Sequence, residues 1–206
     1  SKEYYQMGWT LDENYEEDYF CSRDNRRYFI KKNTTPMIAT LSAEGIVPRL
    51  RWTKRISNGD VLIAQDFEHG RTLEKEDMTD KRIPKILKKV HKSTKLKRIM
   101  KAQGYSEETA SSSLYNLKSI ITDELRKNSN IVSALNYLEN SIPVDDVEYT
   151  PCHTDLHKDN WLLSDQGKLF LVDWEHSILC DPAIDISFVL YRYIPQSDWN
   201  EWLEIY

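Results

Sequence analysis

The segment between residues 153 and 175 constrains this chain more than any other part of it. Two short apolar runs, 161–163 and 169–172, lie on either side of a four-residue turn that ends in glycine. This pattern is typical of a tight β-hairpin. Such a hairpin would bring Asp173, which follows the second run, back beside Asn160, which precedes the first.

The side chains placed by this hairpin suggest a chemistry. Asn160 and Asp173 offer the oxygen ligands that a divalent cation requires. Asp155, five residues before Asn160, could accept a proton from an attacking hydroxyl. Metal ligands and a proton acceptor are what phosphoryl transfer needs from a protein. An ordinary polar turn, held by local side-chain hydrogen bonds, is the alternative.

Composition sets broad limits. The 206 residues are 40% hydrophobic and 30% charged, which predicts a soluble globular chain of one large domain or two small lobes. The net charge of −5 gives no general case for nucleic-acid binding. No apolar run approaches the roughly 18 residues of a membrane span, and the first residues do not resemble a signal peptide. The three cysteines form no C-x-x-C pair, which predicts a reduced, cytoplasmic protein.

The first third of the chain reads as a small sheet with one helix. A strand is expected at 28–31, and Pro36 opens a helical stretch that Gly45 ends. Two further strands are expected at 49–56 and 61–67, because they flank the hairpin signal Asn-Gly. Before residue 26 no element is predicted, and no glycine-rich phosphate loop is found.

Two charges in this part form a candidate ion pair. Lys31 lies on the expected strand and Glu44 near the end of the expected helix. Paired, they would direct an ammonium group at nucleotide phosphates. The alternative is two unrelated surface charges.

Helical periodicity dominates after a crossing at 65–70. Apolar residues recur at helical spacing in several segments, which are 83–90, 114–125, 131–138, 184–194 and 199–206. The predicted fold class is therefore α+β, with a sheet-containing N-lobe at 1–67 and a mainly helical C-lobe at 68–206.

A basic run raises a different possibility. Ten Lys or Arg residues lie between positions 81 and 101, and such a run can follow a phosphate backbone. The cations interleave with Ile83, Leu87 and Val90 at helical spacing. We therefore favour the polar face of an ordinary helix over a nucleic-acid site.

A family resemblance strengthens the first interpretation. The pattern His153-x-Asp155-x-x-x-x-Asn160, followed by the apolar run that ends in Asp173-Trp174-Glu175, resembles the aminoglycoside phosphotransferase and choline kinase family. The resemblance covers most of residues 26 to 195 and implies a two-lobed, protein-kinase-like fold. It is greatest to a short Gram-positive branch that is linked to cell-cycle control and is thought to phosphorylate the sugar of nucleosides.

The resemblance also implies roles. ATP and Mg²⁺ would be the cofactors, with Asn160 and Asp173 as metal ligands and Asp155 as the catalytic base. Residues on the N-lobe side would bind the nucleotide: Lys31 with Glu44 at the phosphates, and backbone groups of Gln65 to Phe67 at adenine. His157 would donate to the transferring phosphoryl group, or it is a loop histidine with a structural partner.

Three neighbouring side chains have weaker assignments. His153 is expected to brace the catalytic loop by hydrogen bonding. Asp185 is expected to receive loop amides or His153. Glu175 stays open as an outer metal ligand, a substrate contact or a surface acid.

The chain departs from the family in one respect. Members usually carry a glycine-rich loop between the first two strands of the N-lobe, whereas residues 10–15 contain no glycine. Loss of this loop would weaken ATP binding, which keeps a catalytically silent regulatory protein as an alternative.

The acceptor of the phosphoryl group is a small molecule with a hydroxyl. A nucleoside sugar is slightly favoured over choline, ethanolamine, thiamine or an aminoglycoside. A cationic acceptor would call for an aromatic or acidic cage, and aromatic side chains for one are available in the last third of the chain: Trp174, Tyr191, Tyr193, Trp199 and Trp202.

Overall fold

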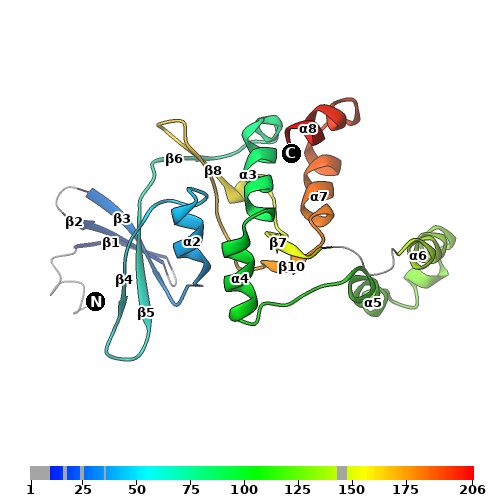
Figure 1. Cartoon of the computed structure of the whole chain (residues 1–206), viewed down its shortest axis with the longest axis horizontal. Coiled ribbons are helices and arrows are strands. Elements are labelled where there is room, and N and C mark those ends of the chain that lie inside the picture. The colour runs from blue at the N-terminus through cyan, green and yellow to red at the C-terminus, as the bar shows by residue number, and fades with distance from the viewer. Residues whose placement is uncertain (1–9, 16–17, 24–25, 35, 143–147) are drawn as a thin grey trace.

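The structure is a computed structural model, and it describes residues 10–15, 18–23, 26–34, 36–142 and 148–206. Its strand-rich half and its helical half follow one another along the chain (Figure 1). The predicted fold class is confirmed.

A five-stranded antiparallel sheet forms the first half, with strand order β1-β2-β3-β5-β4. The strands predicted around 28–31, 49–56 and 61–67 are confirmed as β3, β4 and β5. The segment that sequence reasoning left unassigned supplies β1 and β2, which form an antiparallel pair. The strand bounds are β1 Thr10–Tyr15, β2 Asp18–Arg23, β3 Arg26–Lys32, β4 Leu50–Arg55 and β5 Val61–Asp66.

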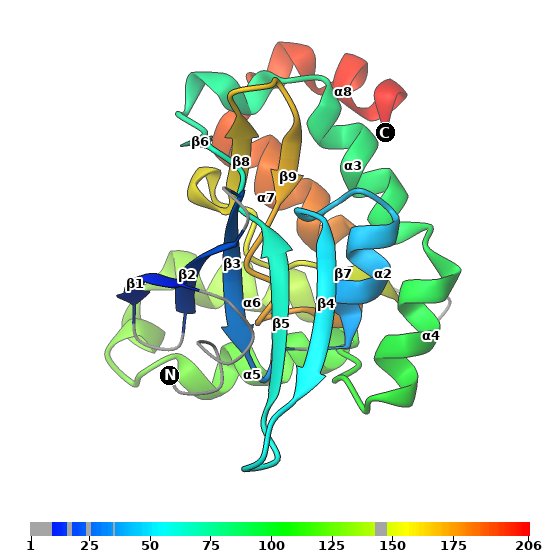
Figure 2. The ribbon, with the colours of Figure 1, turned by 90° about the vertical axis from the view of Figure 1, so that its left-hand side faces the viewer.

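Helix α2, Met37–Ala43, lies beside β4 in the view that faces the sheet (Figure 2). It follows Pro36, as predicted. Its buried side chains, Met37 and Leu41, belong to the large core of the helical half rather than to the small apolar cluster of the sheet. The helix therefore connects the two halves through shared packing.

The helical half begins with α3, Arg82–His91, and α4, Thr94–Ala102. Sequence periodicity did not reveal the break between them. It lies at Ser93, whose hydroxyl caps α4 by accepting from the amide of Leu96. The helices predicted near the chain's end are confirmed as α7, Ala183–Tyr193, and α8, Trp199–Ile205.

Short strands carry the loops of the site. The expected hairpin is confirmed as β8, Trp161–Ser164, and β9, Leu169–Leu171, with Trp161 opposite Leu171. Strand β6, Gly70–Thr72, pairs with β8. A Cβ at Gly70 would lie 2.1 Å from the Leu163 carbonyl oxygen, so this close approach requires glycine. Strand β7, Thr150–Cys152, pairs with β10, Ile178–Cys180.

Helices α5, Ala110–Ile120, and α6, Ser129–Ser141, project from this body at the right of Figure 1. Both were predicted from apolar periodicity, and both form. Neither buries a side chain, however, and Ile120 is 72% exposed. Four single 3₁₀ turns complete the described elements: η1 Glu76–Thr79, η2 Leu125–Lys127, η3 Lys158–Asn160 and η4 Gln196–Asp198.

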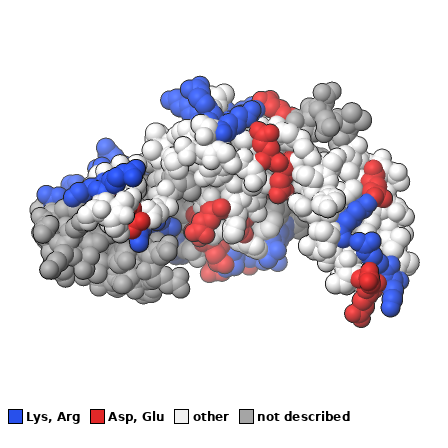
Figure 3. All heavy atoms as spheres, turned by 90° about the horizontal axis from the view of Figure 1, so that it is seen from below, with Lys and Arg blue, Asp and Glu red and all other residues white. Residues whose placement is uncertain are grey.

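The basic run lies on α3 and α4, whose apolar side chains are buried as the helical interpretation requires. Several of its cations have acidic partners, among them Lys81 with Glu201 and Lys97 with Glu148. On the face shown in Figure 3, basic and acidic side chains are interspersed. Among the described residues, no helix is long and apolar enough to cross a membrane.

Candidate active site

Asp185, on the first turn of α7, fixes the start of the candidate catalytic loop, residues 153–160. Its carboxylate accepts hydrogen bonds from the backbone amides of His153, at 2.9 Å, and Thr154, also at 2.9 Å. The side chain is completely buried. The expectation that Asp185 receives loop amides is confirmed.

The ring of His153 braces the loop from within, as expected. Its Nε2 donates to the Val172 carbonyl oxygen at 2.7 Å, and its Nδ1 accepts from the Asp155 amide at 3.2 Å. Burial lowers the pKa of His153. The ring is therefore neutral, with its proton on Nε2, and it links the catalytic loop to the end of the β8–β9 hairpin.

Asn160 orients the candidate base. Its Nδ2 donates to the Asp155 carbonyl oxygen at 2.7 Å and to Asp155 Oδ2 at 3.1 Å. These bonds fix the amide's orientation and direct Asn160 Oδ1 away from Asp155. The Asp155 side chain remains 33% exposed, so a substrate can reach it.

The hairpin brings Asp173 to Asn160 as predicted. The amide of Val172 donates to the Asn160 carbonyl oxygen at 2.9 Å, which places Asp173 at the next position. The backbone of Asp173 is left-handed, with φ of 60°. An unusual backbone angle at a reacting centre is a common feature of functional sites.

The donor set at Asn160 and Asp173 fits Mg²⁺. Asn160 Oδ1 and the Asp173 carboxylate are hard oxygen ligands. Within the described part of the chain, no hydrogen bond or ion pair occupies either group. Both are therefore available to a cation.

His157 contacts the candidate base directly. Its Nε2 lies 3.3 Å from Asp155 Oδ1, and its ring packs edge-on against Phe188 of α7, with ring centres 5.0 Å apart. The structure thus gives His157 a partner, and this partner is the candidate base Asp155. Its expected contact with the phosphoryl group stays a prediction.

Lys31 and Glu44 are not brought together. Glu44 ends α2, and its Oε1 accepts from the Ser93 hydroxyl at 2.6 Å, while its carbonyl oxygen accepts from Lys89. The Lys31 ammonium lies over the Phe29 ring, 5.5 Å from its centre. The expected ion pair is therefore absent among the described contacts, because Glu44 faces the start of α4.

A cavity of about 560 Å³ separates the sheet from the hairpin. Lys31, Gln65 and Phe67 line its sheet side, and Asp173 and Glu175 line the opposite side. The volume is in the range of small-molecule and cofactor sites. The cavity joins the candidate nucleotide residues to the candidate metal ligand.

The structure narrows the backbone groups of Gln65 to Phe67 that are available for the expected adenine contacts. The amide of Asp66 donates to the Arg49 carbonyl oxygen, and that of Phe67 donates to the Arg27 carbonyl oxygen. The Gln65 side chain donates to the Pro48 carbonyl oxygen. The amides of Asp66 and Phe67 are thus engaged within the protein, so a bound base would have to use carbonyl oxygens or amides further along.

Comparison with known proteins assigns the family. Residues 16–206 match the model of the phosphotransferase enzyme family. The chain belongs to this family.

Two curated family relatives are similar in short segments. The chain is 47% identical over 45 residues to the protein LicA of Haemophilus influenzae, and 50% identical over 40 residues to LicA of the Rd strain. These segments make up 22% and 19% of this chain but only 13% and 15% of the two LicA proteins.

Solved structures of phosphotransferases share the fold. The choline kinase LicA from Streptococcus pneumoniae is 20% identical with a TM-score of 0.62, covering 100% of this chain and 78% of that one. The macrolide 2′-phosphotransferase MphH from Brachybacterium faecium is 16% identical with a TM-score of 0.67, covering 100% and 80%. Spectinomycin phosphotransferase APH(9)-Ia, in complex with ADP and spectinomycin, is 16% identical with a TM-score of 0.65, covering 96% and 74%.

Sequence reasoning missed Thr154 and Phe188 near the loop, and it considered Tyr193 only as a possible cage residue. Thr154 has a left-handed backbone, with φ of 67°, and its hydroxyl donates to the His176 carbonyl oxygen. Tyr193 accepts a hydrogen bond from the Lys158 amide through its hydroxyl. Phe188 and Tyr193 could have been found from their positions on α7, because they follow Asp185 by about one and two helical turns. Thr154 gave no such signal.

Proposed function

We propose that the protein is an ATP- and Mg²⁺-dependent small-molecule kinase that transfers the γ-phosphoryl group to a hydroxyl. The observation that supports this proposal is the cavity, which is lined by Lys31 on one side and by Asp173 on the other. In this scheme residues 1–67 supply the nucleotide side and residues 68–206 the catalytic loop and metal ligands. Membership of the phosphotransferase family supports it.

The proposed reaction begins at Asp155. Its carboxylate orients the acceptor hydroxyl and takes the proton as the hydroxyl oxygen attacks phosphorus. The new O–P bond forms as the bond from the γ-phosphorus to the bridging oxygen breaks, and ADP leaves with the electron pair. Asn160 holds the base in place through its two bonds to Asp155.

Charge on the phosphates would be met from both sides of the cavity. Lys31 neutralises phosphate charge from the sheet side. Bound by Asn160 and Asp173, Mg²⁺ would stabilise the charge that develops on the phosphoryl oxygens. Glu175 also lines the cavity, two residues beyond Asp173. This position favours a contact with the metal or with water bound to the metal over a plain surface role.

We propose a nucleoside sugar as the acceptor. Beside His157, Phe188 already has a cationic neighbour, because the Arg192 guanidinium lies 5.5 Å from the centre of its ring. A second cation would be repelled there, which disfavours quaternary ammonium and aminoglycoside acceptors at this ring. Of the other candidates for an aromatic cage, Trp174 and Trp202 are buried, and Trp199 packs against Tyr191. Tyr193, like Phe188, already has the Arg192 guanidinium near its ring, 6.0 Å from the centre.

Choline is the second candidate acceptor. The observation that favours it is the similarity to LicA, in short sequence segments and in the fold of the Streptococcus pneumoniae choline kinase. A choline site would have to be built from residues other than Phe188, or require Arg192 to move.

An ATP-consumption screen tests both acceptors. Purified protein with Mg-ATP is offered nucleosides, choline, ethanolamine, thiamine and aminoglycosides, and the products are identified by mass. We expect a nucleoside monophosphate, and expect Asp155→Asn to lower kcat about 10²- to 10⁴-fold, the range typical of a lost general base.

The matched control is Asp159→Asn. Asp159 is 69% exposed and pairs with Lys158, so the same change there should leave turnover within about twofold, as for most surface substitutions. Undiminished turnover in Asp155→Asn would refute the catalytic assignment. No thermal stabilisation by Mg-ATP, together with no product from any acceptor, would favour the catalytically silent alternative.

A further inference from the structure

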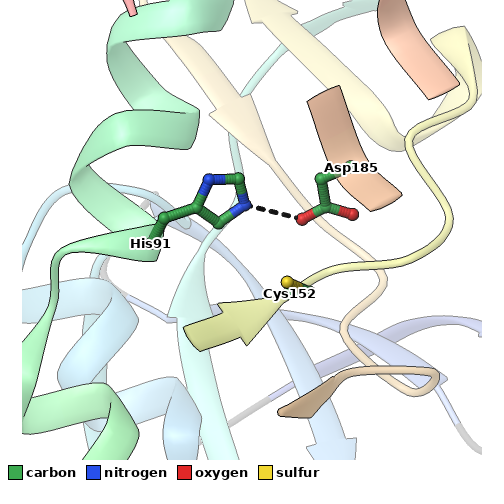
Figure 4. Close-up of side chains that lie close together, drawn as sticks. All are labelled: His91, Cys152 and Asp185. Atoms are coloured by element: carbon green, nitrogen blue, oxygen red, sulfur yellow. Dashed lines mark hydrogen bonds and ion pairs between the residues drawn. The ribbon is translucent and has the colours of Figure 1, made fainter. Parts of the chain in front are cut away.

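Three side chains from different elements meet behind the catalytic loop (Figure 4). His91, the last residue of α3, points at Asp185 of α7, and Cys152 of β7 lies beside them. His91 Nε2 is 2.9 Å from Asp185 Oδ2, and His91 Nδ1 is 2.7 Å from the Tyr206 hydroxyl. The side chains of His91 and Asp185 are 1% and 0% exposed.

The same carboxylate oxygen serves both His91 and the catalytic loop. Asp185 Oδ2 accepts from His91 and from the His153 amide, while Oδ1 accepts from the Thr154 amide. A buried carboxylate needs compensation for the loss of water. The two amides supply part of it, and the ring of His91 supplies the only side-chain donor among the described contacts of Asp185.

The ring of His91 carries a proton on both nitrogens at neutral pH. Burial opposes this charge, but the hydrogen bond that the ring donates to Asp185, with a smaller contribution from Cys152, outweighs it and raises the pKa of His91 to about 9. The groups that face the ring are Asp185 from α7, Cys152 from β7 and Tyr206 after α8. Burial raises the pKa of Tyr206 to about 12, so its hydroxyl keeps its proton and accepts from Nδ1.

A metal site formed by these three residues is disfavoured. Their ligand atoms lie within 4.8 Å of one another. However, both ring nitrogens of His91 are engaged, and Asp185 already has three donors. A hydrogen bond with Cys180 and burial raise the pKa of the Cys152 thiol, whereas a metal requires the thiolate. The arrangement is a hydrogen-bonded network.

We propose that His91 is a positioning residue for phosphoryl transfer. It fixes Asp185, Asp185 fixes the amides of His153 and Thr154, and these set the direction of Asp155. Tyr206 holds the ring from its other side. The role rests on the proposed kinase function, but the contact itself can be tested without any substrate.

Amide hydrogen exchange followed by NMR is the direct test. His91→Leu removes the donor, His91→Gln keeps a neutral donor, and Tyr206→Phe removes only the second partner of the ring. Lys92→Gln is the control, because it removes an exposed charge at the next position without touching the network. Exchange of the His153 and Thr154 amides is compared with that of β3 amides, which report on the rest of the fold.

We expect His91→Leu to speed exchange of these two amides about tenfold or more, a loss typical of a charge-assisted hydrogen bond. His91→Gln should restore part of the protection, and Lys92→Gln should leave it unchanged. In turnover, kcat should fall about 10- to 100-fold in His91→Leu, as for other residues that orient a reacting group. The KM for ATP should stay constant, because the nucleotide cavity does not include His91.

Equal exchange of the two loop amides in wild type and His91→Leu would overturn the role of His91. If His91→Leu does not fold, equal exchange in wild type, His91→Gln and Tyr206→Phe overturns it instead. A wild-type protein that turns over no acceptor would refute the proposed function, whatever the exchange rates are. Failure of the positioning role of His91 and failure of the proposed kinase function can thus be told apart.

Discussion

At the scale of single residues, the site stores backbone strain at two non-glycine positions. Thr154 and Asp173 both have left-handed backbones, with φ of 67° and 60°. For an L-residue this conformation costs roughly 1–2 kcal/mol, and a β-branched threonine is an unusual occupant. Asp185 and the His176 carbonyl oxygen hold Thr154 through its amide and hydroxyl. These bonds offset the strain and fix the residue before Asp155.

The strain at Thr154 can be separated from its hydrogen bond. Thr154→Ala loses the hydroxyl and keeps the strain, so we expect it to lower the free energy of unfolding by about 1 kcal/mol. Thr154→Gly also loses the hydroxyl but tolerates the left-handed backbone, so it should be about 0.5–1 kcal/mol more stable than the alanine variant. Urea unfolding of both variants measures the difference, and an alanine variant as stable as the glycine variant would contradict it.

Removing one charge from the proposed metal ligands gives the second residue-scale prediction. Asp173→Asn should weaken Mg-ATP binding about tenfold or more while changing metal-free ATP binding little, since a neutral amide binds a hard cation less well. Calorimetric titration with ATP measures the first affinity in the presence of Mg²⁺ and the second in the presence of a chelator. The control is Asp165→Asn in the exposed β8–β9 turn, and equal loss in the two variants would exclude Asp173 as a metal ligand.

At the scale of elements, short strands and helix ends position the site. The β8–β9 hairpin returns the chain to Asn160, and the first turn of α7 presents Asp185 to the loop. The contact between α2 and α4 passes through Glu44, which accepts from the capping hydroxyl of Ser93. Glu44 therefore joins two helices, a structural role that differs from the expected phosphate-directing one.

Paired variants of Lys31 and Glu44 test this reassignment. Lys31→Met should weaken ATP binding about tenfold or more, because Lys31 lines the cavity and the change removes its positive charge. Glu44→Ala should leave ATP affinity nearly unchanged and lower stability by about 1–2 kcal/mol, since it leaves Ser93 without its acceptor. Calorimetry and thermal unfolding measure the two effects. If Glu44→Ala loses ATP affinity as strongly as Lys31→Met, the result would support the Lys31–Glu44 ion pair expected from the sequence.

Sequence patterns correctly predicted the structural features that are determined by residues close together in the chain. The hairpin, the spacing from Asp155 to Asn160 and the helix after Pro36 are encoded within a few residues of one another, and the structure has all three. The predicted partner of Glu44 was Lys31, whereas the structure pairs it with Ser93. The prediction was wrong because the approach of α2 to α4 is set by packing between residues far apart in sequence. The exposure of the apolar faces of α5 and α6 was not foreseeable either, since apolar periodicity shows only that a helix is amphipathic and not what covers it.

At the scale of the whole molecule, two buried histidines link stability to pH, because their pKa values are shifted in opposite directions. His91 is held protonated, with its pKa raised to about 9, and His153 is held neutral, with its pKa lowered. His91 connects α3 with α7, and His153 connects the loop with the β8–β9 hairpin. The packing of the helical half therefore depends on both protonation states.

Stability should decline on both sides of near-neutral pH. The His91 contribution is fully present below the ordinary histidine pKa of 6.5 and is lost as the pH rises through about 9, on the order of 3 kcal/mol. The His153 contribution is present above 6.5 and falls as the pH drops below it. Urea unfolding across this range measures both, and His91→Gln should flatten the alkaline side. An unchanged alkaline slope in that variant would exclude His91 as its source.

The shared core of α2 has a consequence for motion. Met37 and Leu41 pack into one core with Leu87 and Leu96 of the helical half, and interiors packed in this way do not slide freely. We therefore expect any opening of the cavity to move the five-stranded sheet relative to α2, while α2 stays with the helical half. The more deformable contact is then expected within the first half of the chain, between the sheet with its small apolar cluster and helix α2, which packs into the other core.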